Sequence, residues 1–515
     1  MLLDLTWNRY KRELNISYIA KNGTRQFYTK SLNYIKTYEY DEHGEFETWN
    51  GRRCRAVFKP TTTYIPNDFD ILEYMYNLPS DVNKAMHAQY FPKLYTFDIE
   101  TEFKENEFPY PDKAEHKVTA ISLCGTDLSC MIFGLKNMSE ESIALLRERV
   151  LNYIRNNEFA RHIVGNNTPK VIYKFFNTEE EMLKTWFTEI MPKTACLAGW
   201  NSYGFDYQYL VNRLKRLFGE QEAKTLIKKS SPTREVQQYS WEEMSGDRIS
   251  VLGPCHTILL DYMKIVDKYD YVLRPYESLS LDWVASKAVG AHKVEYEGDL
   301  QQLYERDYEW YYFYNAVDSI LVQLIHQKLK ALESPCAVSS LTLCTLLNSM
   351  GQVALTTAAV FEEFYNDNKK VVYKPDETER VKHPYEGAFC GCVAGRFEWN
   401  VCYDFKSLYP TQVETCNLSF ENILFKTVPN AIAGQPPIIV PWSEEELDRF
   451  KKDPNYFVTV NNNVYKNDKD YVFRRMQKKY KANRDIYKYT GQRIESQLIT
   501  EIDRLIAEKE KLSAV

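Results

Sequence analysis

The 515-residue chain lacks the features that mark several protein classes. Its eleven cysteines include no Cys-x-x-Cys pair, and its eight histidines do not cluster. We therefore expect Cys390, Cys392, Cys402 and Cys416 to be reduced, mostly buried thiols and not a zinc site. No apolar run reaches about 18 residues, so no membrane span is predicted, and the first residues do not resemble a signal peptide. These absences favour a protein of the reduced cytoplasm.

A net positive charge is also missing. The formal net charge is −6, whereas a protein that only coats nucleic acid is normally basic. The balance fits an enzyme whose acids hold metal ions and whose basic residues act locally. Tyrosine is abundant, with 39 residues, which suits base stacking, although core packing is its commoner use. The length predicts about three domains.

The first part of the chain, residues 1–85, has the pattern of β-strands. Three runs alternate in polarity and are separated by turn pairs such as Asn22-Gly23 and Asn50-Gly51. The runs are 15–20, 25–30 and 53–62. This part contains no catalytic constellation, so we expect a β-rich accessory domain.

The apolar run 94–101 carries two acids. If it forms a strand, Asp98 and Glu100 lie on the same side. Burial of two carboxylates is costly unless a cation neutralises them. A pair of divalent cations would do so, whereas an edge strand with both acids in water is the alternative.

Two further acids follow before residue 330. Asp206 comes after a loop with Asn and Gly and before a helical pattern, so it is either a site residue or a helix cap. Tyr314 and Asp318 are four residues apart and would share one face of a helix. The alternative for Asp318 is the rim of an aromatic helix packed into a core.

A different acidic motif occupies residues 402–410. The preceding alternation of apolar residues predicts a strand that ends at Asp404, then a turn with Ser407 and Tyr409, then a helix. Phosphoryl transfer needs a fixed carboxylate for metal ions and N–H groups for phosphates. A solvated Asp at a strand end is the alternative for the acid alone.

Taken together, these motifs resemble those of family B DNA polymerases, in particular the T-even bacteriophage replicative polymerases. Asp-x-Glu, Asn-x-x-x-Phe-Asp and Tyr-x-x-x-Asp are similar to the three exonuclease motifs of the proofreading DEDD family. Asp-x-x-Ser-Leu-Tyr-Pro resembles the first palm motif. The segments 199–201, 258–262 and 276–282 are also similar to the T-even group.

The resemblance implies an α/β multidomain protein. We expect an N-terminal accessory domain at 1–85, rejoined by 331–375, and an RNase H-like 3′→5′ exonuclease domain at 86–330. A partial palm at 376–463 and partial fingers at 464–515 would follow. Within the exonuclease domain, the turn-rich region 231–254 is expected to carry a β-hairpin that helps to part the primer from the template.

For the exonuclease site, the resemblance implies two-metal hydrolysis of the 3′-terminal phosphodiester. Two Mg²⁺ or Mn²⁺ ions would be held by four carboxylates, and Tyr314 would orient the attacking water. The metal-binding set is Asp98, Glu100, Asp206 and Asp318. Residues expected to contact DNA, by the same resemblance, are Asn201, Phe205, Tyr385 and Gly387, with Tyr203 as an alternative to Phe205.

For the polymerase site, the resemblance implies that Asp404 binds two metal ions once the site is completed. The backbone that follows, at Ser407, Leu408 and Tyr409, would cradle the nucleotide. Arg484 and Lys488 are similar to the Arg-x-x-x-Lys of family B fingers, which grips the triphosphate. Arg475 and Lys479 have the same spacing, so the register is open.

Several polymerase motifs are not found in this sequence. Neither Lys-x-x-x-Asn-Ser-x-Tyr-Gly after the palm motif nor Asp-Thr-Asp is present. Apolar residues at helical spacing between 487 and 512 predict a helix that needs a partner. We therefore expect DNA primer–template and dNTPs as substrates only with a carboxy-terminal polymerase subunit, through which a sliding clamp would be reached. A truncated longer chain would look the same. A stand-alone exonuclease or a DNA-binding scaffold are the alternative functions.

Overall fold

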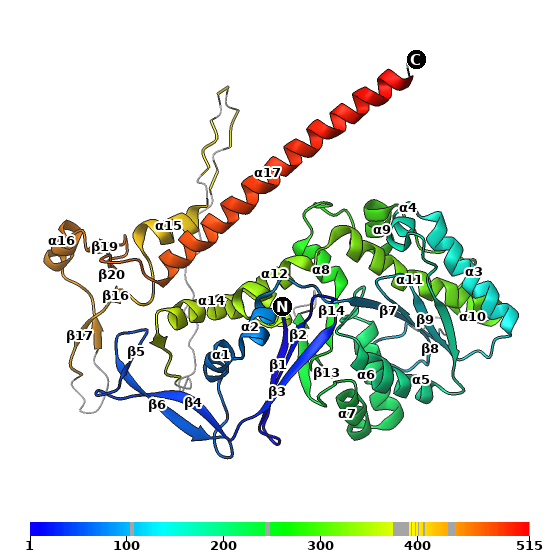
Figure 1. The fold of residues 1–515 in the computed structure, drawn as a ribbon, viewed down its shortest axis with the longest axis horizontal. Helices are drawn as coiled ribbons and strands as arrows, with labels where there is room; N and C mark the ends of the chain where they lie inside the picture. The colour runs from blue at the N-terminus through cyan, green and yellow to red at the C-terminus, as the bar shows by residue number, and fades with distance from the viewer. Residues whose placement is uncertain are drawn as a thin grey trace. The chain divides into compact units, whose positions relative to one another are not determined.

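The computed structural model describes residues 1–102, 108–242, 248–373, 391–392, 394–396, 398–399, 401–404, 407–430 and 438–513. These residues form two compact units (Figure 1). The first unit contains residues 1–35, 59–66 and 74–358, and the second contains residues 36–58, 67–73 and 359–515. Each unit is described separately below.

The first unit is built around a six-stranded sheet with the order β10-β9-β8-β7-β11-β14. Strand β8 runs antiparallel to β7 and β9, whereas β10 is parallel to β9, and β11 is parallel to β7 and β14. The strands are β7 (Leu94–Thr101), β8 (Val118–Cys124), β9 (Cys130–Gly134), β10 (Val171–Phe175), β11 (Cys196–Gly199) and β14 (Ile258–Asp261).

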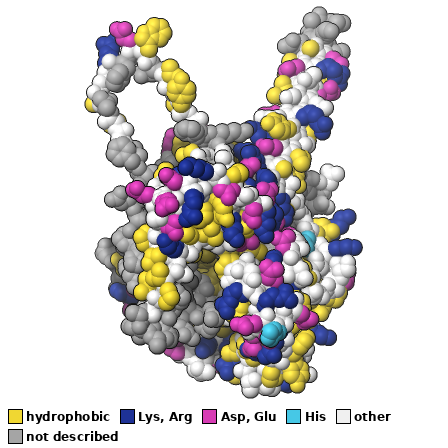
Figure 2. Space-filling model, turned by 90° about the vertical axis from the view of Figure 1, so that its left-hand side faces the viewer, with side chains coloured by type: hydrophobic (Ala, Val, Ile, Leu, Met, Phe, Trp, Pro, Cys, Tyr) yellow, Lys and Arg dark blue, Asp and Glu magenta, His cyan; other side chains and the backbone are white. Residues whose placement is uncertain are grey.

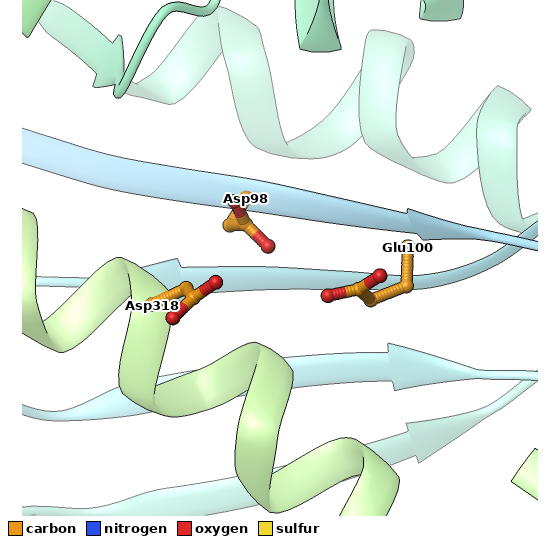
Figure 3. Close-up of side chains that lie close together, drawn as sticks. All are labelled: Asp98, Glu100 and Asp318. Carbon is orange, nitrogen blue, oxygen red and sulfur yellow. The ribbon is translucent and has the colours of Figure 1, made fainter. Parts of the chain in front are cut away.

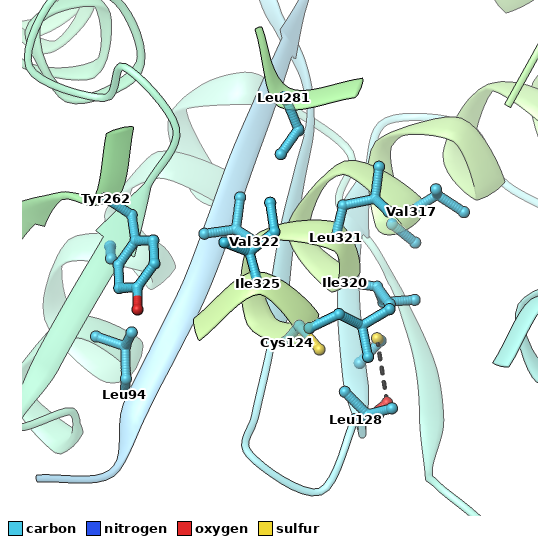
Figure 4. Close-up of a cluster of buried hydrophobic side chains, with 14 of the residues drawn as sticks. Leu94, Cys124, Leu128, Tyr262, Leu281, Val317, Ile320, Leu321, Val322 and Ile325 are labelled. Carbon is cyan, nitrogen blue, oxygen red and sulfur yellow. Dashed lines mark hydrogen bonds between the residues drawn. The ribbon is translucent and has the colours of Figure 1, made fainter. Parts of the chain in front are cut away.

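Helices cover both faces of this sheet, and each face has its own hydrophobic core. Helix α11 (Tyr308–Leu329) packs on β7 and β8 (Figure 1). Figure 4 shows its residues Val317 and Ile320 in one core with Leu94. Phe97, two residues before Ile99 on β7, lies in the other core. Because strand side chains alternate in direction, Asp98 and Glu100 must share the face of Leu94, on which α11 packs.

The remaining helices of the first unit complete these two layers. The first core includes α3 (Glu140–Asn156), α4 (Glu158–Val164), α8 (Tyr262–Tyr269), α9 (Leu281–Val289) and α10 (Leu300–Arg306). The second core includes α5 (Glu179–Thr185), the π-helical turn Trp186–Ile190, the 3-10 turn Met191–Lys193, α6 (Asp206–Phe218) and α7 (Glu220–Lys229). Further helices are α2 (Ser80–His87), α12 (Glu333–Thr342) and α13 (Leu346–Ser349).

The strands predicted at 15–20, 25–30 and 53–62 are confirmed, whereas three further strands of this region, Leu2–Asn8, Tyr34–Tyr40 and Phe46–Thr48, were missed. The first unit contains the antiparallel sheet β1-β2-β3, formed by β1 (Leu2–Asn8), β2 (Glu13–Ile19) and β3 (Arg25–Ser31). Gly23 makes the predicted turn with φ of 77°. Strand β1 was among the missed strands, although Leu3, Leu5 and Trp7 alternate with Asp4, Thr6 and Asn8, a pattern typical of a strand.

The β-hairpin expected in region 231–254 is also present. Strands β12 (Val236–Glu242) and β13 (Arg248–Pro254) pair antiparallel over their whole length. Tyr239 and Trp241 from β12 are buried in the second core, so aromatic packing anchors the described part of the hairpin on that core.

Two helix boundaries differ from the sequence prediction. The Ser334-Pro335 pair is a sequence signal for a helix end, but α11 already ends at Leu329, where Lys330 adopts a left-handed conformation. Pro335 lies in the first turn of α12, where a missing N–H costs nothing. The sequence pattern over 339–364 favours one helical run, but the structure divides it: Leu343, with a φ of 51°, ends α12, and a second break at 350–351 separates α13 from α14 (Gln352–Asn366).

The second unit contains the sheet β15-β5-β6-β4. The short strand β15 (Lys369–Lys370) pairs with β5 (Phe46–Thr48), so the chain returns to strands formed near its beginning. The other strands of the sheet are β4 (Tyr34–Tyr40) and β6 (Arg53–Pro60). Two smaller sheets contain β16 (Ile423–Leu424), β17 (Lys426–Val428), β18 (Ile438–Val440), β19 (Tyr456–Val458) and β20 (Val464–Lys466).

The helices of the second unit include a very long one. Helix α17 (Val472–Ser513) packs its first turns on α14 (Gln352–Asn366) through Val472, Met476 and Phe364. Beyond these turns it carries apolar side chains that are exposed in Figure 2 alongside charged ones. The other helices that contribute to this unit are α1 (Asp68–Tyr76), α15 (Leu408–Cys416) and α16 (Glu444–Lys452).

The cysteines meet the expectation of burial only in part. Cys416 is buried, but Cys392 and Cys402 are exposed, because the described residues around them form no helix or strand that could cover them. Cys390 lies outside the described residues.

Among the helices in the described ranges, none is both long and apolar enough to cross a membrane.

Candidate active site

Strand β7 and helix α11 bring three acids together. One carboxylate oxygen each from Asp98, Glu100 and Asp318 lies within 4.8 Å of the others. Figure 3 shows the three side chains pointing into one space between the strand and the helix. Asp98 is half-buried, whereas Glu100 and Asp318 are buried. The prediction that Asp98 and Glu100 share one side of a strand is therefore confirmed.

Hydrogen bonds hold α11 close to the sheet at this point. Thr96 Oγ1 donates to the carbonyl of Ser319 at 2.7 Å, and Ser122 Oγ donates to the carbonyl of Asn315 at 2.8 Å. The residues opposite the two strand acids are small: Ser122 pairs with Asp98, and Ala120 with Glu100. Small side chains allow the helix to approach, so Asp318 reaches the acids of β7.

Asp206 lies next to this group but is not one of the three closest acids. It is buried at the first position of α6, and its Oδ1 accepts a hydrogen bond from the backbone N–H of Ile99 at 3.2 Å. The carboxylate therefore faces β7, between the positions of Asp98 and Glu100. The alternative of a helix cap is not supported, because Phe205 occupies the N-cap position and no side chain caps this helix.

Burial and mutual repulsion change the acidity of the four carboxyls. Burial raises the pKa of Asp98 well above its ordinary value, and the charges of Asp318 and Asp206 add to this effect. Burial, followed by the charge of Asp318, raises the pKa of Glu100 to about 8. Burial likewise raises the pKa of Asp206 to about 7. Four carboxyl groups thus meet in a space where their ionised forms repel one another, and where one or more cations would stabilise these ionised forms.

Two residues of the site were missed by sequence reasoning. Lys293 Nζ donates to Asp318 Oδ2 at 2.6 Å, and Asn315 Nδ2 donates to Asp98 Oδ2 at 2.8 Å. Asn315 lies three residues before Asp318, so its place on the same helical face was a usable signal. Lys293 lies in the loop after α9, and nothing in its sequence context marks it.

Tyr314 lies beside the acids, as predicted from its spacing to Asp318. Lys293 Nζ donates to the Tyr314 hydroxyl at 3.4 Å and lies 5.4 Å from the centre of its ring. Burial raises the pKa of Tyr314 above its ordinary value, and the charges of Asp318 and Glu100 raise it further. The phenol therefore stays protonated and can donate a hydrogen bond at neutral pH.

The donor set fits divalent metal ions. Asp318 Oδ1 is buried and has no hydrogen-bond partner among the described residues, although a buried carboxylate oxygen is normally paired. Hard oxygen donors are the ligands that Mg²⁺ and Mn²⁺ prefer. Asp98, Glu100 and Asp318, with Asp206 beside them, are the residues that could hold such ions.

The turn before α6 contains the residues expected to contact DNA. Asn201 has a φ of 59° and donates its backbone N–H to Asp261. Phe205 is half-buried and packs on Tyr209 and on the exposed Phe108. Tyr203 instead stacks on Trp241, 5.2 Å between ring centres, and donates its hydroxyl to the Leu259 carbonyl. Of the two aromatic residues, Phe205 is the better placed for a base.

The palm-type motif is described only in part. Asp404 is exposed, and the described residues before it form no strand, contrary to prediction. Trp399 and Tyr403, expected to alternate along that strand, are about nine-tenths exposed, at 92% and 88%, because no described strand pairs with this segment. A helix, α15, follows Ser407 as predicted, but it begins at Leu408, so Tyr409 lies in the helix and not in the preceding turn; Ser407, Leu408 and Tyr409 are all exposed. Tyr385 and Gly387 lie outside the described residues.

The two candidate pairs of basic residues on α17 differ in their contacts. Arg475 and Lys479 form ion pairs with acids of α14 and the residues after it, at 2.5 Å to Asp367 and 3.0 Å to Glu363. Arg484 and Lys488 are exposed, and the one ion pair of Arg484 is a 3.8 Å contact with the adjacent Asp485. The first pair is engaged in packing, whereas the second is accessible to a ligand.

Comparison with known proteins identifies the domain that carries the acids. Residues 30–284 match the family described as DNA polymerase family B, exonuclease domain. The chain contains a family B DNA polymerase exonuclease domain. Asp98, Glu100 and Asp206 lie within the matched part of this exonuclease domain, whereas Asp318 and Lys293 lie just beyond it.

Two phage enzymes are similar to the exonuclease domain and to residues beyond it. The chain is 27% identical over 396 residues to a DNA-directed DNA polymerase of Escherichia phage RB69, which covers 74% of this chain and 42% of the relative. It is also 27% identical over 383 residues to that of Enterobacteria phage T4, covering 72% and 40%. The chain thus matches about two-fifths of the length of these relatives.

Proposed function

We propose that this chain is a 3′→5′ exodeoxyribonuclease that hydrolyses the terminal phosphodiester of DNA with two divalent ions, Mg²⁺ or Mn²⁺, and so serves proofreading. The observation that carries the proposal is the cluster of Asp98, Glu100 and Asp318, with its unpaired buried carboxylate oxygen. The exonuclease family match and the two phage relatives support it.

In this proposal each residue of the site has a role. Asp98, Glu100, Asp206 and Asp318 would hold the ions, which supply a water of lowered pKa and neutralise charge on the phosphate oxygens. The phenolic O–H of Tyr314 would donate a hydrogen bond to the attacking water and so orient that water toward the phosphorus atom. Lys293 keeps Asp318 in place, and Asn315 does the same for Asp98.

The site also suggests how the substrate end is held. Phe205 would stack on a terminal base, since aromatic faces accept any base, and Asn201 would contact the same nucleotide. Both belong to the turn that delivers Asp206. A single-stranded or frayed 3′ end is the substrate form that exposes its terminal bases to such contacts.

A second activity, DNA-templated polymerisation, is proposed for the chain only together with a second chain that supplies the missing palm, fingers and thumb motifs. Asp404 would hold the polymerase ions, Ser407, Leu408 and Tyr409 would cradle the dNTP, and Arg484 and Lys488 would grip its triphosphate. The accessibility of Arg484 and Lys488, against the ion-paired Arg475 and Lys479, supports this choice of register. Since both relatives are phage enzymes, we place the reaction in a host cytoplasm.

The test uses a 5′-labelled primer annealed to a template, with Mg²⁺ and this chain alone. Shortening of the primer without extension, even with all four dNTPs, is expected. Extension would contradict the need for a second chain. No change in primer length would contradict the exonuclease proposal and favour a DNA-binding scaffold. If the primer is shortened, but adding a partner chain never leads to primer extension, the result would favour a stand-alone exonuclease.

A further inference from the structure

A residue outside the acid cluster packs directly on Tyr314. The ring of Tyr296 meets the ring of Tyr314 edge to face, with ring centres 5.3 Å apart and an angle of 86° between the planes. From the same loop, Lys293 contacts the same ring through its ammonium group. The loop that follows α9 therefore touches Tyr314 with two side chains that are three residues apart.

Hydrogen bonds from three helices fix this loop. The Lys293 N–H donates to Asp282 Oδ1 of α9 at 2.7 Å. Tyr153 of α3 donates its hydroxyl to the His292 carbonyl at 2.7 Å. Trp310 of α11 donates Nε1–H to the Glu295 carbonyl at 3.1 Å. A backbone held at residues 292, 293 and 295, directly before Tyr296, gives the Tyr296 side chain a defined position.

The surroundings of Tyr296 place it at the border between the acids and an open cavity. It lines a cavity of about 400 Å³ together with Arg306 and Trp310. Burial raises the pKa of its phenol, and the nearby charge of Glu100 raises it further. The Tyr296 ring therefore separates Tyr314 from the solvent-filled side of the loop.

We propose that Tyr296 is a positioning residue for hydrolysis: its ring holds the Tyr314 ring in the orientation that aims the Tyr314 hydroxyl at the attacking water. This inference rests on the proposed exonuclease function. It does not require that Tyr296 contacts DNA or metal. Loss of the ring would leave Tyr314 free to rotate, so the rate of the chemical step would fall while binding of DNA would not.

The test is a double-mutant cycle on single-turnover hydrolysis of a 5′-labelled single-stranded oligonucleotide with Mg²⁺. Tyr296→Leu is expected to lower the maximal rate about 3- to 10-fold, with less than about a 2-fold change in the half-saturating DNA concentration. Tyr296→Phe, which keeps the ring, is expected to restore the rate. Tyr314→Phe should cost much less in the Tyr296→Leu background than in the wild type.

Two additional variants separate positioning from folding. Tyr304→Leu removes a ring of α10 that packs on Tyr311 of α11, with ring centres 4.8 Å apart, and should not change the rate. Trp310→Phe releases the loop from α11 while it leaves both tyrosines in place, and should lower the rate in the same way as Tyr296→Leu, which keeps the test decisive if that variant fails to fold.

The outcomes distinguish this inference from the function on which it rests. A wild-type chain that does not shorten DNA would overturn the proposed function before any variant is compared. If the wild type is active, strictly additive effects of Tyr296→Leu and Tyr314→Phe would overturn the positioning role alone. A Tyr296→Leu rate equal to the wild-type rate would do the same.

Discussion

Lys293 and Asp318 form an ion pair inside the acid cluster, with Nζ 2.6 Å from Oδ2. Burial opposes the charge of Lys293, but Asp318 and the neighbouring groups raise its pKa above the ordinary value. One oxygen of Asp318 is thus occupied by a fixed cation, and the other, Oδ1, has no partner among the described residues. The ion pair therefore orients Asp318 so that its second carboxylate oxygen remains available as a metal ligand beside Asp98 and Glu100.

Replacing this lysine should change the pH dependence of hydrolysis. The charge of Lys293 lowers the pKa values of Asp98, Glu100 and Asp318, so Lys293→Gln should move the acidic limb of the rate profile upward by about 0.5 to 1 pH unit. The rate at neutral pH should fall about 10- to 100-fold. Lys287→Gln, at an exposed position of α9, is the control. An unshifted limb in Lys293→Gln would contradict this role.

Stability without metal ions should fall as the pH rises. The pKa of Glu100 is raised from an ordinary 4.5 to about 8, so between these pH values the folded state binds more protons than the unfolded state. The free energy of unfolding then decreases with increasing pH, by on the order of 1 to 3 kcal/mol between pH 5 and about 8. Thermal melting with EDTA measures this slope.

Metal ions should reverse this effect. Mg²⁺ favours the ionised carboxylates, so it should stabilise the chain more at pH 8 than at pH 5 and should release protons on binding. Glu100→Gln removes one titrating group and should flatten the slope measured in EDTA. If Glu100→Gln melted with the same pH dependence as the wild type, the pKa shift at this site would be refuted.

Two glycine substitutions should act in opposite directions. In β9, a Cβ on Gly134 would lie 2.4 Å from Tyr173 Oη and 2.5 Å from Tyr312 Cζ, so Gly134→Ala should destabilise the sheet by about 1 to 3 kcal/mol. In α17, Gly491 has open space around it, so Gly491→Ala should stabilise the helix by about 0.5 to 1 kcal/mol. Amide hydrogen exchange in β9 and α17 measures both. If both substitutions stabilised the protein, or both destabilised it, the packing around Gly134 or Gly491 would be different from that given above.

The polymerase proposal makes a separate prediction. Asp404→Ala should leave 3′ hydrolysis unchanged, because the Asp98 cluster does not include Asp404. In a complex with a chain that supplies the missing motifs, the same variant should abolish nucleotide addition. Primer extension by the complex measures synthesis, and primer shortening measures hydrolysis. Synthesis that survives Asp404→Ala would show that the palm interpretation is wrong.

The acid cluster was largely predictable because its residues follow local periodicity. Asp98 and Glu100 share a strand face by their spacing of two, and Tyr314 and Asp318 share a helix face by their spacing of four. The direction of Asp206 was not predictable, because its hydrogen bond to Ile99 joins residues 107 positions apart. Lys293 was not predicted for the same reason, since its ion pair with Asp318 depends on how the loop after α9 packs against α11.

Other parts of the fold could not be derived from local patterns. The alternation of Leu3, Leu5 and Trp7 with polar residues could have revealed strand β1, but its pairing with β2 could not be derived from that pattern. The division of 333–366 into three helices depends on the left-handed backbone at Leu343, a residue without a preference for it, and on a second break at 350–351. The strand expected before Asp404 is absent from the described residues because strands need hydrogen-bonding neighbours, and its pattern alone could not provide them.

The most direct measurement is the fate of a 5′-labelled single-stranded oligonucleotide with Mg²⁺, comparing the wild type with Asp98→Ala and with Glu141→Ala, an exposed control on α3. The wild type and Glu141→Ala should give a ladder of shortened products. Asp98→Ala should bind the oligonucleotide equally well but cut at least about 100-fold more slowly. Undiminished cutting by Asp98→Ala would contradict the assignment of the active site.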